Sequence, residues 1–183
     1  MRPSPPQIGR TEPSPGLVRR LEAGARAVLP GFGAALLMVL AAGPTGLPTL
    51  VAAVTLPQVV FWSIFRPAAM APPVVFLLGL LLDLLSLAPL GTGVLTLLVA
   101  QGVAVTWRRF LARQGFLVMW LGFCGFAAGA SALGYALTAL LSFSLPPVQP
   151  AFHQAMLAIG LYPAFAALLG RLHRTMLRAE EAA

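Results

Sequence analysis

The chain has 183 residues, of which 58% are hydrophobic and 9% are charged. Soluble domains carry about 25% charged residues, so this composition excludes an ordinary soluble domain and indicates a membrane protein of one compact unit. The formal net charge is +7, and the arginines that supply it lie between apolar segments instead of on one polar face, which excludes a nucleic-acid partner.

Side chains that carry catalysis or bind metals are scarce. The sequence has two histidines and one cysteine, Cys124, which lies in an apolar run and is interpreted as a small packing residue. It contains no zinc-ligand spacing, no Walker motif and no Gly-x-Ser-x-Gly motif. We therefore predict a protein that is not an enzyme and that uses no metal or cofactor.

The N-terminal segment is predicted to lie outside the membrane. Residues 1–16 hold five prolines and no apolar periodicity, which predicts a solvated tail, with a polyproline-type ligand as the alternative. Residues 17–26 contain three arginines and are predicted to form a short helix at the membrane surface. Residues 19–43 resemble a signal peptide, but Pro44 and further hydrophobic runs follow, so we expect no cleavage.

Residues 29–65 contain no charged side chain. As a single helix this segment would be about 55 Å long, whereas the hydrocarbon core of a bilayer is about 30 Å thick. The sequence Gly-Pro-Thr-Gly-Leu-Pro at residues 43–48 breaks the segment into a hairpin of two short spans. Pro57 is predicted to kink the second span and to free a carbonyl group near Gln58.

The third span, residues 72–93, is the stretch around which the chain is predicted to be organised. It carries Asp83, the only acidic residue between Glu22 and Glu180. A charged side chain at the centre of a membrane helix costs about 2.5–3.5 kcal/mol, so Asp83 is expected to be buried against protein and satisfied there. Gly79, Asp83 and Ser86 share one helical face, and the turn residues at 88–93 end the helix.

We interpret Asp83 as a polar anchor that fixes the packing of the third span. Its expected partners are His153, Thr138 and Tyr135, which helical rise places at a similar depth. The alternative is a carboxyl group close enough to the interface to be hydrated.

Three further spans are predicted at residues 92–107, 116–143 and 151–172. The fifth span contains Gly125-x-x-x-Gly129, a spacing that lets helix backbones approach closely. This pair is predicted to form a packing face, either inside the subunit or with a partner span.

The arginines test this topology. With six spans, every arginine lies on one side, and the opposite connections near 43–48, 88–93 and 143–150 contain no charged residue. The positive-inside rule therefore predicts six transmembrane helices, with both termini in the cytoplasm. The predicted organisation is a cytoplasmic tail and short basic segment at 1–26, a transmembrane domain at 27–172 and a second tail at 173–183.

Residues 79–91 read Gly-Leu-Leu-Leu-Asp-Leu-Leu-Ser-Leu-Ala-Pro-Leu-Gly, and this run resembles the signature of MreD, a membrane subunit of the bacterial rod-shape machinery. A second, weaker match is Pro150-x-Phe152, followed by Tyr162-Pro163 and a basic tail. The resemblance covers about residues 44–176, and the proline-rich N-terminal tail is longer than the family leads us to expect.

The resemblance implies a non-enzymatic scaffold subunit of the bacterial inner membrane. Its implied partners are an MreC-like protein, the MreB filament, the RodA–transpeptidase pair that builds lateral peptidoglycan, and the lipid bilayer. The implied fold is similar to the six-helix substrate-binding subunits of energy-coupling-factor transporters. The candidate packing and partner-binding residues are Gly79, Asp83, Ser86, Pro89, Gly91, Gly125, Gly129, His153, Tyr162 and Pro163.

That fold similarity supplies the alternative function, a substrate-binding membrane subunit of a vitamin-type transporter. Such a subunit needs several polar side chains that converge near the outer face. The candidates for this role are Asp83, Ser86, His153, Gln154, Thr138 and Tyr135. A membrane-embedded protease is disfavoured, because it needs paired catalytic groups and the sequence offers one membrane carboxyl group.

Overall fold

The computed structural model describes the backbone of residues 17–45 and 48–181, and the side-chain surroundings of residues 29–43 and 49–175. Throughout the described residues the chain forms helices and short connections with no strand, which confirms the all-α prediction. The helices are α1 (Leu17–Thr45), α2 (Pro48–Phe65), α3 (Pro72–Ser86), α4 (Thr92–Leu111), α5 (Phe116–Ser142) and α6 (Gln149–Glu181).

The helix boundaries follow local chemistry. The predicted break at 43–48 is confirmed, since α1 ends at Thr45 and α2 begins at Pro48. Two prolines open α3, where a missing N–H costs nothing, and the residue that follows the helix, Leu87, adopts a left-handed conformation with φ 53°. Ala88 then donates its N–H to the Asp83 carbonyl at 3.2 Å, so the last turn of α3 closes tightly.

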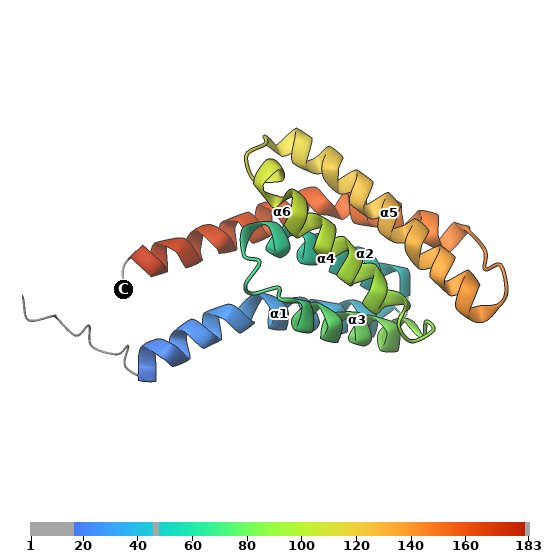
Figure 1. Ribbon diagram of the computed structural model, residues 1–183, viewed down its shortest axis with the longest axis horizontal. Coiled ribbons are helices and arrows are strands. Elements are labelled where there is room, and N and C mark those ends of the chain that lie inside the picture. The colour runs from blue at the N-terminus through green and yellow to red at the C-terminus, as the bar shows by residue number, and fades with distance from the viewer. Residues whose placement is uncertain (1–16, 46–47, 182–183) are drawn as a thin grey trace, which may run out of the picture.

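Helix α2 is the packing centre of the molecule. It lies among the other helices (Figure 1) and contacts each of them, and nearly all of residues 51–64 are buried. A helix that is apolar all round is stable only when it is surrounded. The expectation that residues 72–93 organise the fold is therefore wrong for the packing as a whole, because that role belongs to α2.

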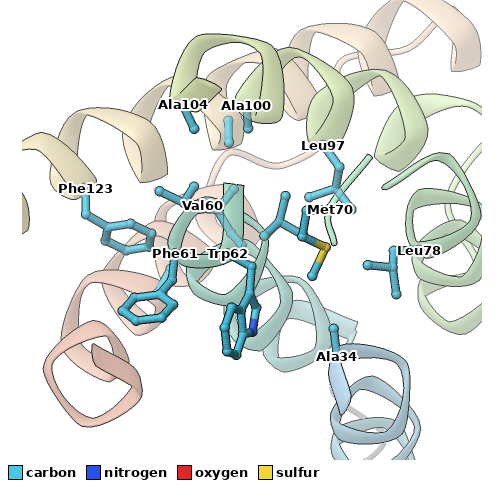
Figure 2. Close-up of a cluster of buried hydrophobic side chains, with 14 of the residues drawn as sticks. Ala34, Val60, Phe61, Trp62, Met70, Leu78, Leu97, Ala100, Ala104 and Phe123 are labelled. Atoms are coloured by element: carbon cyan, nitrogen blue, oxygen red, sulfur yellow. The ribbon is translucent and has the colours of Figure 1, made fainter. Parts of the chain in front are cut away.

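The core surrounds α2, and Val60, Phe61 and Trp62 point from it in different directions (Figure 2). Trp62 and Val60 lie among Met70, Leu97 and Phe123, and all five are buried. In a bilayer such side chains hold helices together through close van der Waals packing, because lipid tails are as apolar as they are.

Polar groups buried on and beside α2 mostly bond to nearby carbonyls. The side-chain N–H of Gln58 donates to the Val54 carbonyl at 3.0 Å, across the helical turn that contains Pro57. Gln101 of α4 donates to the Met70 carbonyl at 2.8 Å, which fixes the α2–α3 connection to α4. These bonds offset the cost of removing the amides from water.

Within residues 29–43 and 49–175, whose side chains the structure describes, three helical segments are long and apolar enough to cross a membrane: Thr92–Leu111, Phe116–Ser142 and Gln149–Thr175. The apolar segments Leu29–Gly43, Thr49–Phe65 and Pro72–Ser86 are shorter. Large apolar side chains are exposed along the outward faces of several helices, as a lipid environment requires, among them Phe32, Leu77, Leu117 and Leu140. Membrane insertion is thus supported by length and composition, and the six-span arrangement stays a prediction.

The two ends of the described chain differ from the predicted segments. Helix α1 is continuous from Leu17 to Thr45, so residues 17–26 do not form a separate short helix. Helix α6 continues to Glu181, nine residues beyond the predicted end of the last span at residue 172. The predicted tail at 1–16 lies outside the described residues.

Candidate functional site

The Asp83 side chain joins the end of α3 to the start of α4. It is 1% exposed, and its two carboxyl oxygens accept three hydrogen bonds. Oδ1 accepts the backbone N–H of Gly93 at 2.6 Å and the hydroxyl of Thr92 at 3.0 Å, and Oδ2 accepts the backbone N–H of Gly91 at 2.8 Å. A side chain of one helix therefore caps the next.

Helix α4 needs this external cap. The residue before it, Gly91, has no side chain and adopts φ 101°, so no local side-chain cap is made. The first N–H groups of a helix lack partners inside it, and the positive end of the helix dipole favours a carboxyl group there. Hydrogen bonds that involve a charged group are worth about 1.5–3 kcal/mol each, which offsets the cost of burying Asp83.

Glycines allow α3 and α4 to approach closely enough for this cap. A Cβ on Gly79 would lie 2.5 Å from the Cα of Val94, and a Cβ on Gly93 would lie 2.6 Å from Asp83 Oδ1. Non-bonded heavy atoms do not approach within 3.0 Å of a Cβ, so neither position accepts a side chain without a shift of its neighbours. Gly79, Gly91 and Gly93 are thus required by backbone approach or by positive φ.

The turn between the two helices is held by Pro89. Its carbonyl accepts the backbone N–H of Thr92 at 3.2 Å. The Thr92 hydroxyl also lies 2.9 Å from this carbonyl, so its one proton is shared between Pro89 and Asp83. Pro89, Gly91 and Asp83 therefore belong to one local structure.

The partners expected for Asp83 are not the ones it uses. His153 is exposed, and its ring lies 6.4 Å from that of Phe152. Tyr135 and Thr138 line the same cavity as Asp83, yet the three bonds to the carboxyl group come from residues 91–93. Two of these donors are backbone N–H groups, which every residue except proline carries. The signal in the sequence was Gly-Thr-Gly directly after the turn.

A cavity of about 260 Å³ adjoins the capped turn. It is bordered by the α3–α4 and α5–α6 connections, which lie at the end of the bundle away from the C-terminus (Figure 1). Its polar lining residues are Thr49, Asp83, Ser86, Thr92, Thr96, Ser131, Tyr135, Thr138 and Gln154. Ser86, Thr96 and Ser131 each present a buried hydroxyl without a hydrogen-bond partner.

Gly125 and Gly129 lie on an open surface. No atom comes within 4 Å of the position of a Cβ on either glycine. Both line a groove of about 310 Å³ between α4 and α5, together with Val99, Val103 and Phe126. The packing face predicted for this pair is therefore not used inside the subunit, and the partner-span alternative is the one that stays open.

Tyr162 and Pro163 have different surroundings. Tyr162 is buried and stacks on Phe123, with ring centroids 4.2 Å apart and planes inclined by 18°. Pro163 is exposed. Trp120 of α5 also donates to the Ile159 carbonyl at 3.3 Å, so Tyr162 belongs to the α5–α6 contact.

Within the described part of the chain, no three His, Cys, Asp or Glu side chains lie together where they could hold a metal ion. Comparison with known protein families, curated proteins and solved structures found no match for this chain. The structure therefore defines an all-helical, membrane-type protein with a carboxyl-capped helix turn, an adjoining polar cavity and an open small-residue groove.

Proposed function

We propose that the protein is a non-enzymatic scaffold subunit of the bacterial inner membrane, of the MreD type. In this role it couples an MreC-like protein and the MreB filament to the RodA–transpeptidase pair that builds lateral peptidoglycan. The six helices cross the membrane, and both termini lie in the cytoplasm.

The proposal rests on one observation, namely that the MreD-like residues 79–91 form the joint between α3 and α4. Gly79, Asp83, Pro89 and Gly91 all build the joint between α3 and α4. The one buried carboxyl group of the described membrane region is engaged by three donors in a helix cap. Its role is architectural, which suits a scaffold.

The groove between α4 and α5 supports the same proposal. Membrane helices associate through small residues that allow close backbone contact, and Gly122, Gly125 and Gly129 follow one another along this groove. Helix α5 contacts α4 and α6 and reaches α2 only weakly, so one of its faces is open to another chain. A transmembrane helix of an MreC-like partner is the proposed occupant.

Co-purification tests this function. The full chain is expressed with an MreC-type protein and, separately, with an unrelated single-span membrane protein of similar length. We expect stable co-purification with the first only, together with restoration of rod shape in cells that lack their own MreD. Equal recovery of both proteins, or no recovery of either, would contradict the proposal.

The polar cavity favours a second candidate, a substrate-binding subunit of a vitamin-type transporter. Its lining combines hydroxyl groups, one amide and apolar walls, as small-molecule sites do. Recovery of the chain with an ATP-hydrolysing coupling complex, and not with an MreC-type protein, would favour this candidate.

A further inference from the structure

We propose that a phospholipid with an anionic headgroup binds at the connection between α4 and α5. One of its acyl chains lies in an apolar groove between these helices, and its phosphate lies at Arg108, Arg109 and Arg113. The inference goes beyond the proposed function and does not depend on it. It rests on the chemistry of the groove, on the charges at one end of it and on its length.

A groove of about 440 Å³ opens between the last turns of α4 and the first turns of α5, and we call it the Trp107 groove. Every side chain that lines it is apolar. Most of the side chains along its walls are exposed, among them Trp107, Phe110, Val118 and Leu121. Large apolar side chains gathered on an open surface indicate contact with a membrane or with another apolar partner. The groove therefore suits an apolar occupant.

The floor and the end of the Trp107 groove have different chemistry. Leu111 is buried and lies over Gly122, where a Cβ would come 3.1 Å from Leu111 Cδ2, so the glycine keeps the floor low. Trp107 and Phe110 lie at the end near the α4–α5 connection, with ring centroids 6.3 Å apart and planes inclined by 84°. Tryptophan concentrates at the boundary between acyl chains and headgroups. This end of the groove thus resembles a membrane interface.

Three arginines lie at the same end, at the far end of α4 from the capped turn (Figure 1). Arg108 and Arg109 belong to the last turn of α4, and Arg113 belongs to the connection that follows. Among the residues whose side chains the structure describes, the only acidic one is Asp83. It lies near the start of α4, about 24 Å away by helical rise, where three donors already engage it. No carboxyl group in this part of the chain neutralises the three arginines.

A phosphate group suits this connection. Arginine binds phosphate oxygens through two parallel hydrogen bonds, which a single point charge does not provide. The start of α5 adds a weaker attraction, because its N-cap residue, Gly115, is exposed and makes no side-chain cap. The first N–H groups of a helix lack partners inside it and favour an anion. A headgroup with net negative charge gains from all of these groups, whereas the cationic choline of a zwitterionic headgroup is repelled by the arginines.

The length of the Trp107 groove matches one leaflet of a bilayer. From Leu111 to Val103 the helical rise of α4 amounts to about 12 Å. Half of the hydrocarbon core is about 15 Å thick. An acyl chain that runs along the groove therefore places its headgroup at the arginines. A soluble phosphate compound or an acidic peptide would satisfy the arginines but leave the apolar walls uncovered, so a phospholipid is the occupant that satisfies both.

The Trp107 groove continues into the groove that holds Gly125 and Gly129, because Val103, Gly122 and Phe126 border both. A partner helix and the lipid would consequently be neighbours. A helix that packs on a small-residue pair in a right-handed crossing lies at about 40° to its partner. It diverges from α5 on either side of the crossing, and the acyl chain fills the space that opens toward the arginines.

Quenching of Trp107 fluorescence by brominated lipid tests the site. The full chain, without a partner, is reconstituted into bilayers in which brominated phosphatidylglycerol rises in phosphatidylcholine, and the reciprocal series carries the bromines on phosphatidylcholine. The acyl chains are identical, and quenching requires contact between bromine and the indole ring. Trp62 is buried and out of reach of lipid. The quenching that is lost in Trp107→Phe reports Trp107, and its dependence on lipid fraction gives the relative affinity of the two lipids.

We expect phosphatidylglycerol to be preferred over phosphatidylcholine at Trp107 about 100-fold, because each arginine near a membrane surface contributes about fivefold. Neutralising two exposed arginines, Arg109→Gln with Arg113→Gln, is expected to lower this preference about 25-fold. The matched control is Arg171→Gln with Arg174→Gln on α6, which removes the same charge from exposed positions outside the groove. This pair is expected to leave the preference unchanged.

Three results would overturn the proposal. Equal quenching by the two lipids at equal fractions would show that the groove holds only bulk lipid, and this comparison needs no substitution of an arginine. An equal loss of preference with the α6 pair would assign it to overall charge. Loss of the preference when glycerol 3-phosphate is added would assign the arginines to a free phosphate compound. Because no partner protein is present in these bilayers, each result leaves the scaffold function to the co-purification experiment.

Discussion

Asp83 Oδ1 lies 2.6 Å from the backbone nitrogen of Gly93, and this hydrogen bond ties the last turn of α3 to the first turn of α4. The carboxyl group performs the task that a Ser, Thr or Asp at the N-cap performs in most helices. Here it comes from ten residues earlier in the chain. The helix pair is consequently held at its turn by a side chain and along its length by the close approach at Gly79.

Substitutions of Asp83 test the cap. Asp83→Asn keeps an oxygen for Gly93 and Thr92 but turns an N–H₂ group toward the N–H of Gly91, so one hydrogen bond is lost. We expect Asn to lower the unfolding free energy by about 1–3 kcal/mol and to keep partner binding. Asp83→Leu removes all three bonds and is expected to lose partner binding, and Asp83→Lys is expected to insert poorly.

The measurement combines thermal unfolding in detergent with co-purification of the partner. A Leu variant as stable as the parent would show that the Asp83 cap does not stabilise the fold. An Asn variant that is abundant and stable but inactive would show that the charge itself is used.

The close approach of α3 to α4 predicts that an alanine at Gly79 destabilises the protein. An alanine at Gly102 is the control and should have the opposite effect on stability. Gly79→Ala places a Cβ 2.5 Å from the Cα of Val94, where backbone cannot yield. We expect a loss of about 1–3 kcal/mol, as for other overpacked contacts. Gly102→Ala on α4 meets no atom within 4 Å and should stabilise the helix by about 0.5–1 kcal/mol. Unfolding midpoints measure both, and equal effects of the two substitutions would contradict the close contact.

The helices themselves were predictable from local signals. The turn residues at 43–48 separate α1 from α2, and Pro72 with Pro73 opens α3, because glycine and proline constrain the backbone wherever they occur. The centrality of α2 was harder to foresee. Residues 48–65 and 72–86 are both strongly apolar, and only packing decides which helix is surrounded.

The surroundings of the candidate site were less predictable for a related reason. The partners predicted for Asp83 are side chains such as His153, whereas the main donors are backbone N–H groups of Gly91 and Gly93. Every residue except proline carries such a group, so sequence alone does not mark it. Similarly, the spacing of Gly125 and Gly129 predicts a close helix contact but cannot say which helix makes it.

Membrane topology is tested by cysteine labelling in a Cys124→Ala background. Leu90→Cys and Ser144→Cys, both at exposed positions, are expected to react with an impermeant thiol reagent from outside the cell. Ala68→Cys and Ala112→Cys, also exposed, are expected to react only after the cells are opened. Thr92 is unsuitable as a reporter because it is buried against Asp83. Labelling of position 68 from outside, with no labelling of position 144, would contradict the predicted orientation of the six spans.

The open groove between α4 and α5 gives the most direct test of partner binding. Gly125→Leu and Gly129→Leu place side chains in the groove, and a Cβ at either position meets no atom of this chain within 4 Å, so the isolated protein should unfold at an unchanged or slightly higher temperature. The same side chains would hold a partner helix away from the α5 backbone and are expected to reduce co-purification of the MreC-like protein at least tenfold, about 1.4 kcal/mol of binding free energy. Gly160→Leu on α6 is the matched control, because it too is exposed and meets no atom within 4 Å, yet it lies outside the groove. Two results would place this face against lipid instead: full recovery of the partner with both groove variants, or an equal loss with Gly160→Leu.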